Sequence, residues 1–148
     1  MFVPGSVAWE QATAAKQASR ASLMARGCRH KMRIGGSENA MEEGFIDVGP
    51  ADLTEGELRG LEVGERLVLV VRHHGRITAM DDSCNHAGCL LSGGWLHQRK
   101  AAVVCPCHEY AFELGSGRNL TIPRLCDDQC AFEVRVERGR VMIRFPGE

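Results

Sequence analysis

The chain has 148 residues, of which 44% are hydrophobic and 25% are charged. This is enough core-forming material for one globular domain and too little for two. The formal net charge is only -1 and basic residues are scattered, which argues against nucleic-acid binding and a polybasic membrane anchor. No apolar run approaches the roughly 18 residues of a membrane span, and no secretory h-region is visible. We therefore expect a soluble, cytoplasmic protein.

Residues 1–43 differ in composition from the rest and form a predicted N-terminal extension. They are rich in Ala, Ser, Gln, Lys and Arg, with six basic and four acidic side chains. Residues from Trp9 to Met24 favour a helix, but too few large apolar side chains are present to bury one of its faces. We expect this extension to be mobile or weakly docked. A transit peptide, or a true start at Met41, are the alternatives.

The second segment, residues 44–148, has the period-two pattern of β-strands interrupted by glycine turns. Strands are predicted at 45–48, 67–71, 76–80, 101–104 and 110–114. Alternation over 132–136, a turn at Arg138-Gly139 and a return over 141–145 predict a closing hairpin. A short helix is predicted between Ala51 and Leu61. The expected fold class is all-β, a small antiparallel sandwich or barrel.

Two cysteine–histidine pairs lie where predicted strands run into loops. Cys84-Asn85-His86 forms the first pair and Cys105-Pro106-Cys107-His108 the second. Four such ligands suit zinc or an iron–sulfur centre. Zinc fingers usually pair Cys with Cys and His with His, whereas each loop here supplies one of each kind. One cysteine and one histidine in each loop favour two irons, one bound by two thiolates and one by two imidazoles. This is the ligand set of a Rieske centre.

The C-x-H and C-P-x-H motifs resemble the Rieske family, and the similarity runs from about Glu43 to Phe145. It implies a β domain with two cluster-binding loops and one 2Fe-2S cluster per chain. The two cysteines would bind the inner iron and the two histidines the outer iron, near the surface. The implied function is one-electron transfer between a reductase and an oxygenase or other redox enzyme, with no catalysis by the chain itself. The implied metal and cofactor ligands are Cys84, His86, Cys105 and His108.

Cys89 and Cys107 lie in the same two loops. In Rieske proteins of cytochrome complexes, cysteines at these places form a disulfide that joins the loops, so the resemblance implies a Cys89–Cys107 bond. The alternative is two reduced thiols in a reducing cytosol. The same proteins usually carry Ser and Tyr donors where this chain has Tyr110 and Phe112. Fewer donors stabilise the reduced cluster less, so we predict a potential in the lower part of the Rieske range.

Three further cysteines carry weaker signals. Cys28-Arg29-His30 repeats the C-x-H spacing, but no predicted strand precedes it, so we do not expect it to bind the cluster. Cys126 and Cys130 are interpreted as loop or partly buried thiols. A small disulfide or a metal pair formed by these two residues is the alternative.

Other polar and aromatic residues are not expected to bind the cluster. His73-His74 sits on a glycine turn and His97 follows the Gly93-Gly94 loop, so these histidines are expected to be solvated, and Asp81-Asp82 are expected to lie on a solvated face. Trp95 is interpreted as a core side chain, with packing beside the cluster as the alternative. Glycines 88, 93 and 94 are expected to shape the loops around the cluster, although turn formation alone also explains them.

A second function class remains open at this stage. A zinc-stabilised binding module would use the same four ligands, and a thiol–disulfide redox sensor would use Cys89 and Cys107 as its switch. A catalytic oxygenase is disfavoured, because its mononuclear iron needs a separate large domain and no 2-His-1-carboxylate set is visible.

Overall fold

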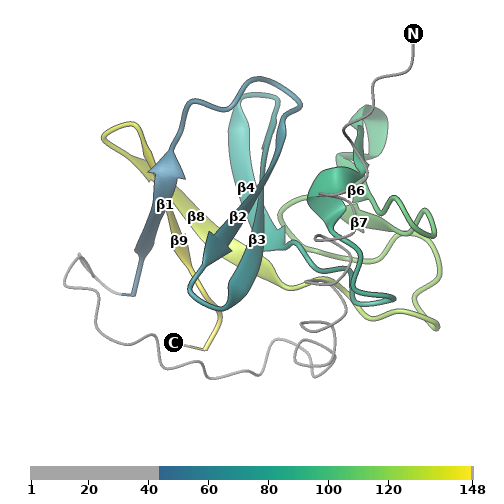
Figure 1. Cartoon of the computed structure of the whole chain (residues 1–148). Helices are drawn as coiled ribbons and strands as arrows, with labels where there is room; N and C mark the ends of the chain where they lie inside the picture. Colours follow the sequence, from purple (N-terminus) through teal and green to yellow (C-terminus); the bar gives the residue numbers. More distant parts are fainter. Residues whose placement is uncertain (1–43, 148) are drawn as a thin grey trace, which may run out of the picture.

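The structure is a computed structural model, and it describes residues 44–147. The predicted extension at 1–43, with its expected helix and the Cys28-Arg29-His30 motif, lies outside these residues. Within the described part, no helix is long and apolar enough to cross a membrane. Figure 1 shows two groups of strands side by side, a larger sheet and a smaller one that carries β6 and β7.

The larger sheet has six strands in the order β1-β9-β8-β4-β3-β2, and every neighbouring pair is antiparallel. The β8–β9 hairpin turns at Arg138-Gly139, as predicted. The strands are β1 (Ile46–Pro50), β2 (Leu58–Val63), β3 (Arg66–His73), β4 (Arg76–Asp81), β8 (Ala131–Glu137) and β9 (Arg140–Arg144).

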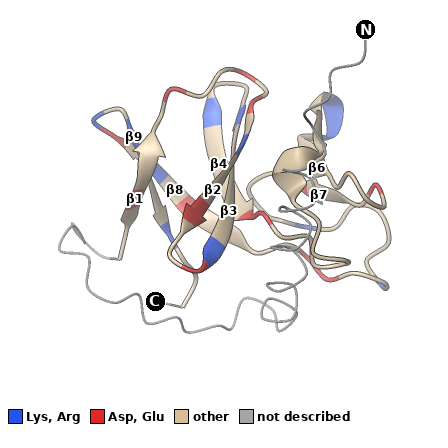
Figure 2. Cartoon of the chain, in the orientation of Figure 1, with Lys and Arg blue, Asp and Glu red and all other residues tan. Residues whose placement is uncertain are grey.

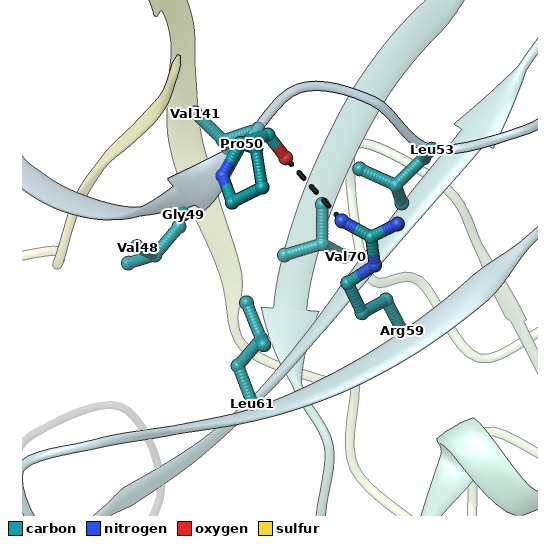
Figure 3. A pocket seen from close by; sticks show the side chains of 8 residues that line it. All are labelled: Val48, Gly49, Pro50, Leu53, Arg59, Leu61, Val70 and Val141. Carbon is teal, nitrogen blue, oxygen red and sulfur yellow. Dashed lines mark hydrogen bonds between the residues drawn. The ribbon is translucent and has the colours of Figure 1, made fainter.

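The two edge strands of this sheet, β1 and β2, curl towards each other. A small pocket of about 20 Å³ is lined by residues of both edges together with β3 and β9. Arg59 of β2 donates from Nη1 to the carbonyl oxygen of Pro50 in β1 (3.3 Å) and to Asp52 Oδ1 (2.7 Å), as Figure 3 shows for the first bond. The sheet is therefore nearly closed into a barrel, which protects its edges.

The smaller sheet has the antiparallel order β5-β6-β7 and is inserted between β4 and β8. Its strands are β5 (Trp95–His97), β6 (Ala102–Val104) and β7 (Ala111–Glu113). Single turns of 3-10 helix, η2 (Leu91–Gly93) and η3 (Gln98–Lys100), flank β5. The all-β fold class is confirmed.

Strand β3 separates two hydrophobic cores. Val68 and Val70 pack into the core of the larger sheet. Leu69 and Val71, on the other face, pack into a second core that also holds residues of the smaller sheet. A strand buried on both faces reads as a continuous apolar run, which explains the predicted strand at 67–71.

The predicted helix at 51–61 is wrong. The described chain has a loop there, followed by β2, which pairs with β3 from Leu58 opposite Val71 to Val63 opposite Arg66. Pairing with β2 provides hydrogen-bond partners for the backbone groups on the outer edge of β3. This gain outweighs the weak local helix preference of residues 51–61, which Gly60 lowers further. Strand β5 was not predicted, because three residues are too few to show a period.

Candidate metal centre

The first cysteine–histidine pair lies in a loop that its own backbone closes. The amide of Cys84 donates to the carbonyl oxygen of Cys89 (2.9 Å), and the amide of Gly88 donates to that of Cys84 (2.7 Å). Gly88 has a φ of 73°, a left-handed conformation that glycine adopts at little cost. The loop directs Cys84 into the protein and leaves His86 exposed.

The second pair lies in a loop of the same design directly after β6. The amide of Cys105 donates to the carbonyl oxygen of Tyr110 (2.8 Å), and that of Glu109 donates to Cys105 (3.1 Å). Glu109 has a φ of 58°, so it repeats the left-handed turn made by the glycine of the first loop. Here too the cysteine is buried and the histidine, His108, is exposed.

The Cys84 and Cys105 thiols contact each other through a hydrogen bond. In each loop, the backbone N–H groups two and three residues after the cysteine point at its sulfur. The hydrogen bond from Cys84 lowers the pKa of Cys105 to about 6, while the pKa of Cys84 is raised because it keeps the shared proton in a buried place. A metal centre would replace that proton and accept both sulfurs as thiolates.

The two exposed imidazoles of these loops lie close together, edge to face. The Nδ1 atoms of His86 and His108 are 3.2 Å apart, and the ring planes meet at 81°. Two tetrahedral nitrogen ligands about 2.0–2.1 Å from one metal lie roughly 3.4 Å apart, so both can bind a single ion. The His86 ring also stacks on the buried Tyr110 ring, with centroids 4.5 Å apart, which holds its orientation.

Cys89 and Cys107 are joined by a disulfide that links the two loops across 18 residues of sequence. The sulfurs of both lie within 4.8 Å of the Cys105 sulfur. Disulfide sulfurs are not thiolates, however, so they leave Cys84 and Cys105 as the thiol pair of the site. Phe112 is fully buried beneath the loops and offers no hydrogen-bond donor.

Of the two acidic residues directly before the first loop, Asp82 is buried and Asp81 is partly buried, so their interpretation as a solvated face is wrong. Asp82 is only 2% exposed and accepts from the amide (2.6 Å) and hydroxyl (2.7 Å) of Ser92. Burial raises the pKa of Asp81 to about 6. Their position at the end of a predicted strand was the feature of the sequence that could have indicated their burial.

Other interpretations also need correction. His73 is only 9% exposed rather than solvated, and Trp95 is 46% exposed rather than in the core. Cys126 and Cys130 are both buried, and Cys126 has a free thiol, so these two are not paired with each other. His97 is half-buried and its Nδ1 accepts from the Lys100 amide (3.3 Å).

A third loop, residues 117–129, packs against the first one and was missed by sequence reasoning. The Gln129 side chain accepts from the amide of Asn85 (3.2 Å) and donates to the carbonyl oxygens of Ser83 (2.5 Å) and Asp81 (2.9 Å). Gly117 allows the two ends of the third loop to lie against each other, since a Cβ at Gly117 would lie 1.9 Å from the Gln129 carbonyl oxygen. No local pattern marks such a contact in the sequence.

A family model supports the assignment that the geometry suggests. The model of the Rieske [2Fe-2S] domain matches residues 45–132. This chain belongs to the Rieske family. Members of this family bind a 2Fe-2S cluster, and this chain, like the ferredoxin components to which it is similar, is an electron carrier.

Similar Rieske proteins are ferredoxin components of oxygenase systems. The chain is 35% identical over 100 residues to the ferredoxin component of an alkene monooxygenase system from Xanthobacter autotrophicus (strain ATCC BAA-1158 / Py2), covering 67% of this chain and 80% of the relative. It is 30% identical over 105 residues to the ferredoxin component of naphthalene 1,2-dioxygenase/salicylate 5-hydroxylase systems from Ralstonia sp, covering 70% and 98%.

Solved Rieske structures agree with the fold. The ferredoxin of carbazole 1,9a-dioxygenase from Nocardioides aromaticivorans IC177 superposes with a TM-score of 0.64 at 24% identity, covering 69% of this chain and 98% of that chain. A chain in the complex of reduced oxygenase and oxidized ferredoxin in carbazole 1,9a-dioxygenase gives a TM-score of 0.61 at 29% identity, covering 68% and 93%.

The residues of the two loops fit a Rieske 2Fe-2S cluster. Two adjacent buried thiols, each approached by two backbone N–H groups, suit an iron held by thiolates in a low-dielectric site. Two facing imidazole nitrogens at the surface suit a second iron.

Proposed function

We propose that the cluster is bound by Cys84 and Cys105 at the inner iron and by His86 and His108 at the outer iron. The observation that carries this assignment is the convergence of the two pairs from separate loops, with the thiols in contact and the Nδ1 atoms 3.2 Å apart. The bound cluster would accept and release one electron at a time.

The protein's own groups would prepare this site for electron transfer. The backbone N–H groups that point at each cysteine sulfur stabilise negative charge on the ligands. The exposed imidazoles give a partner protein a short path to the outer iron, while the buried cysteines keep water from the inner iron. The disulfide between Cys89 and Cys107 holds the two loops together in both redox states.

We further propose that the chain passes electrons from a reductase to an oxygenase or another redox enzyme in the cytoplasm. The similarity to ferredoxin components of oxygenase systems supports this role, as does the likeness to a chain in the complex of oxygenase and ferredoxin of carbazole 1,9a-dioxygenase. Figure 2 shows acidic and basic residues interspersed along the chain. Because neither sign of charge dominates, we expect the partner to dock at the cluster end without strong attraction to a single acidic or basic patch.

The potential is proposed to lie in the lower part of the Rieske range. Phe112 has no donor, and Tyr110, whose ring stacks on His86, has a side chain longer than the Ser whose place it takes. With fewer hydroxyl donors near the sulfurs, the reduced state gains less stabilisation.

The test is an EPR spectrum of the dithionite-reduced protein, with iron and acid-labile sulfide measured on the same sample. We expect a rhombic Rieske signal and about two irons per chain. The His86→Asn and Cys84→Ser variants are expected to lose this signal, whereas His97→Asn, a control outside the ligand loops, keeps it. A colourless protein that binds zinc after anaerobic reconstitution would instead show a zinc-stabilised module.

The partner is tested separately by stopped flow. The reduced protein is mixed with the oxidised oxygenase component of an alkene monooxygenase or naphthalene dioxygenase system, and oxidation of the cluster is followed by absorbance. Electron transfer faster than that to an unrelated acceptor of equal potential supports an oxygenase partner, and equal rates refute it.

A further inference from the structure

Two exposed apolar side chains lie together in the third loop. Among residues 44–147, four large hydrophobic side chains are exposed, namely Trp95, Ile122, Leu125 and Val136. Ile122 and Leu125 belong to one turn, in which the amide of Leu125 donates to the carbonyl oxygen of Ile122 (3.1 Å). Leu125 is 68% exposed and Ile122 is 44% exposed. Single exposed hydrophobic residues are ordinary, whereas neighbouring ones indicate a binding surface.

The backbone of this turn is fixed although its side chains face water. The buried Asn119 side chain donates to the carbonyl oxygens of Ile122 (3.4 Å) and Cys126 (2.8 Å), on either side of the turn. Its oxygen accepts from the amide of Thr121 (2.9 Å). One buried side chain therefore holds both ends of the turn. Because the turn is formed before a partner arrives, docking costs little conformational entropy.

The turn lies between the two points at which the third loop is bonded to the cluster end. The Thr121 hydroxyl accepts from the amide of Ala111 (2.9 Å), three residues after the ligand histidine of the second loop. The Asn85 side chain donates to the carbonyl oxygen of Asp128 (2.5 Å), and Asn85 directly precedes the ligand histidine of the first loop. The exposed side chains of the turn therefore border the region of the two imidazoles.

The ligand loops themselves carry little charge. In residues 84–89 and 105–110, Glu109 is the only Asp, Glu, Lys or Arg. Ala87, Pro106 and the disulfide-bonded Cys107 are exposed beside the histidines. The centres of protein interfaces are depleted in charged residues. A partner that covers the imidazoles therefore meets a largely uncharged surface, to which the third loop adds apolar side chains.

We propose that Ile122 and Leu125 form a docking contact for the oxygenase component that accepts the electron. The inference rests on the proposed function and names the surface that recognises this partner. One-electron transfer brings the redox centre of the oxygenase close to the outer iron, so the oxygenase covers the imidazoles and the turn beside them. The complementary site is an apolar recess next to the accepting centre, which these two side chains fill.

Saturation kinetics of electron transfer test this contact. The reduced full-length protein is mixed in stopped flow with increasing concentrations of the oxygenase component, alkene monooxygenase or naphthalene dioxygenase, whichever accepts electrons faster. Leu125→Asp places a charge in the contact, so we expect the half-saturating oxygenase concentration to rise about 10-fold, with an unchanged limiting rate. Leu125→Ala should raise it about 3-fold.

Val136→Asp is the matched control. Val136 is also a large exposed hydrophobic residue, 52% exposed, but it lies in β8 of the larger sheet. We expect this variant to keep the half-saturating concentration of the wild-type protein. The EPR spectrum and the reduction potential of each variant are measured as well. Unchanged values show that the cluster and the driving force are the same, so that only docking differs.

The outcomes separate this inference from the proposed function. An equal half-saturating concentration for the wild-type protein and Leu125→Asp would overturn the docking contact, as would an equal rise in Val136→Asp. A rise that is found only with the reductase of the same system as partner would overturn the assignment to the oxygenase. If the wild-type protein itself reduces the oxygenase no faster than an unrelated acceptor, the proposed oxygenase partner fails, and this inference fails with it.

Discussion

The two faces of β3 pack against cores with different tasks. The core of the larger sheet consists mainly of aliphatic and phenylalanine side chains on strands of five to eight residues. The core on the opposite face contains three free thiols and is covered by loops and by strands of only three residues. The first core has long ladders to stabilise it, whereas the second depends on particular contacts.

This difference predicts local unfolding. A region with short strands and few ladder hydrogen bonds opens at lower free energy than the rest of a domain. Single changes at the cluster end should therefore release the cluster while the larger sheet stays folded. The following substitutions test this comparison by different routes.

The largest effect is expected from Gly94→Ala. A Cβ at Gly94 would lie 1.9 Å from the carbonyl oxygen of Val104, so β5 and β6 could not keep their pairing. We expect a cost of about 3 kcal/mol, confined to the smaller sheet and measured as a lower urea midpoint for cluster loss. The neighbouring Gly93→Ala is the control, because its Cβ would lie 3.9 Å from its nearest contact, the Pro106 side chain. Equal losses in both variants would contradict the close-approach argument.

Removal of the disulfide should come next in size. Cys89→Ser frees two loops that are joined across 18 residues, and closing a loop of this length contributes about 3 kcal/mol. The expected result is faster loss of the visible absorbance on heating, with little change in the far-UV melting of the larger sheet. Cys107→Ser and the double variant should match the single variant, because each breaks the same bond. A double variant with twice the effect would show that the residues act independently.

Asp81→Asn should raise stability, and only at higher pH. Asp81 Oδ1 is buried without a hydrogen-bond partner, and burial raises the pKa of this carboxyl to about 6. The folded state therefore binds the proton more tightly than the unfolded state, and stability falls as pH rises from about 4 through 6. The Asn variant avoids this loss, so we expect it to gain about 1–3 kcal/mol at pH 7.5 and much less at pH 4.

Asp47→Asn gives the opposite sign and serves as the control for Asp81. The Arg140 hydrogen bond lowers the pKa of Asp47, so its stabilisation is present above the ordinary carboxyl pKa and is lost as pH falls. This exposed pair is worth at most about 1 kcal/mol. Urea titrations at both pH values compare the two variants, and a pH-independent effect of Asp81→Asn would refute the burial argument.

The sequence predicted those parts of the molecule in which residue type alone carries the information. The run Leu67–Val71 and the alternating residues 132–136 lie in β3 and β8 as expected, because burial imposes their pattern. The four ligand candidates were recognised because thiolate and imidazole are the groups that iron binds.

The remaining parts depend on neighbours that lie far away in sequence. Strand β2 forms because β3 offers an unpaired edge, and its own residues show no clear period. Asp82 is buried because Ser92 supplies two donors. Gln129 reaches Asn85 and Ser83 only through the folding of the third loop. None of these contacts leaves a local pattern in the sequence.

The smallest effects are expected from substitutions at equivalent positions of the two ligand loops. Gly88 and Glu109 occupy equivalent places, with φ values of 73° and 58°. A left-handed conformation costs a residue with a side chain roughly 1–2 kcal/mol. Replacing that residue by glycine removes this cost, but part of the gain is offset because glycine has more conformational freedom in the unfolded chain. Glu109→Gly should therefore stabilise the second loop by about 0.5–1 kcal/mol, and Gly88→Ala should destabilise the first by a similar amount. Chemical denaturation monitored at the cluster absorbance measures both changes, and a loss of stability in Glu109→Gly would show that the Glu109 side chain contributes more than its backbone strain costs.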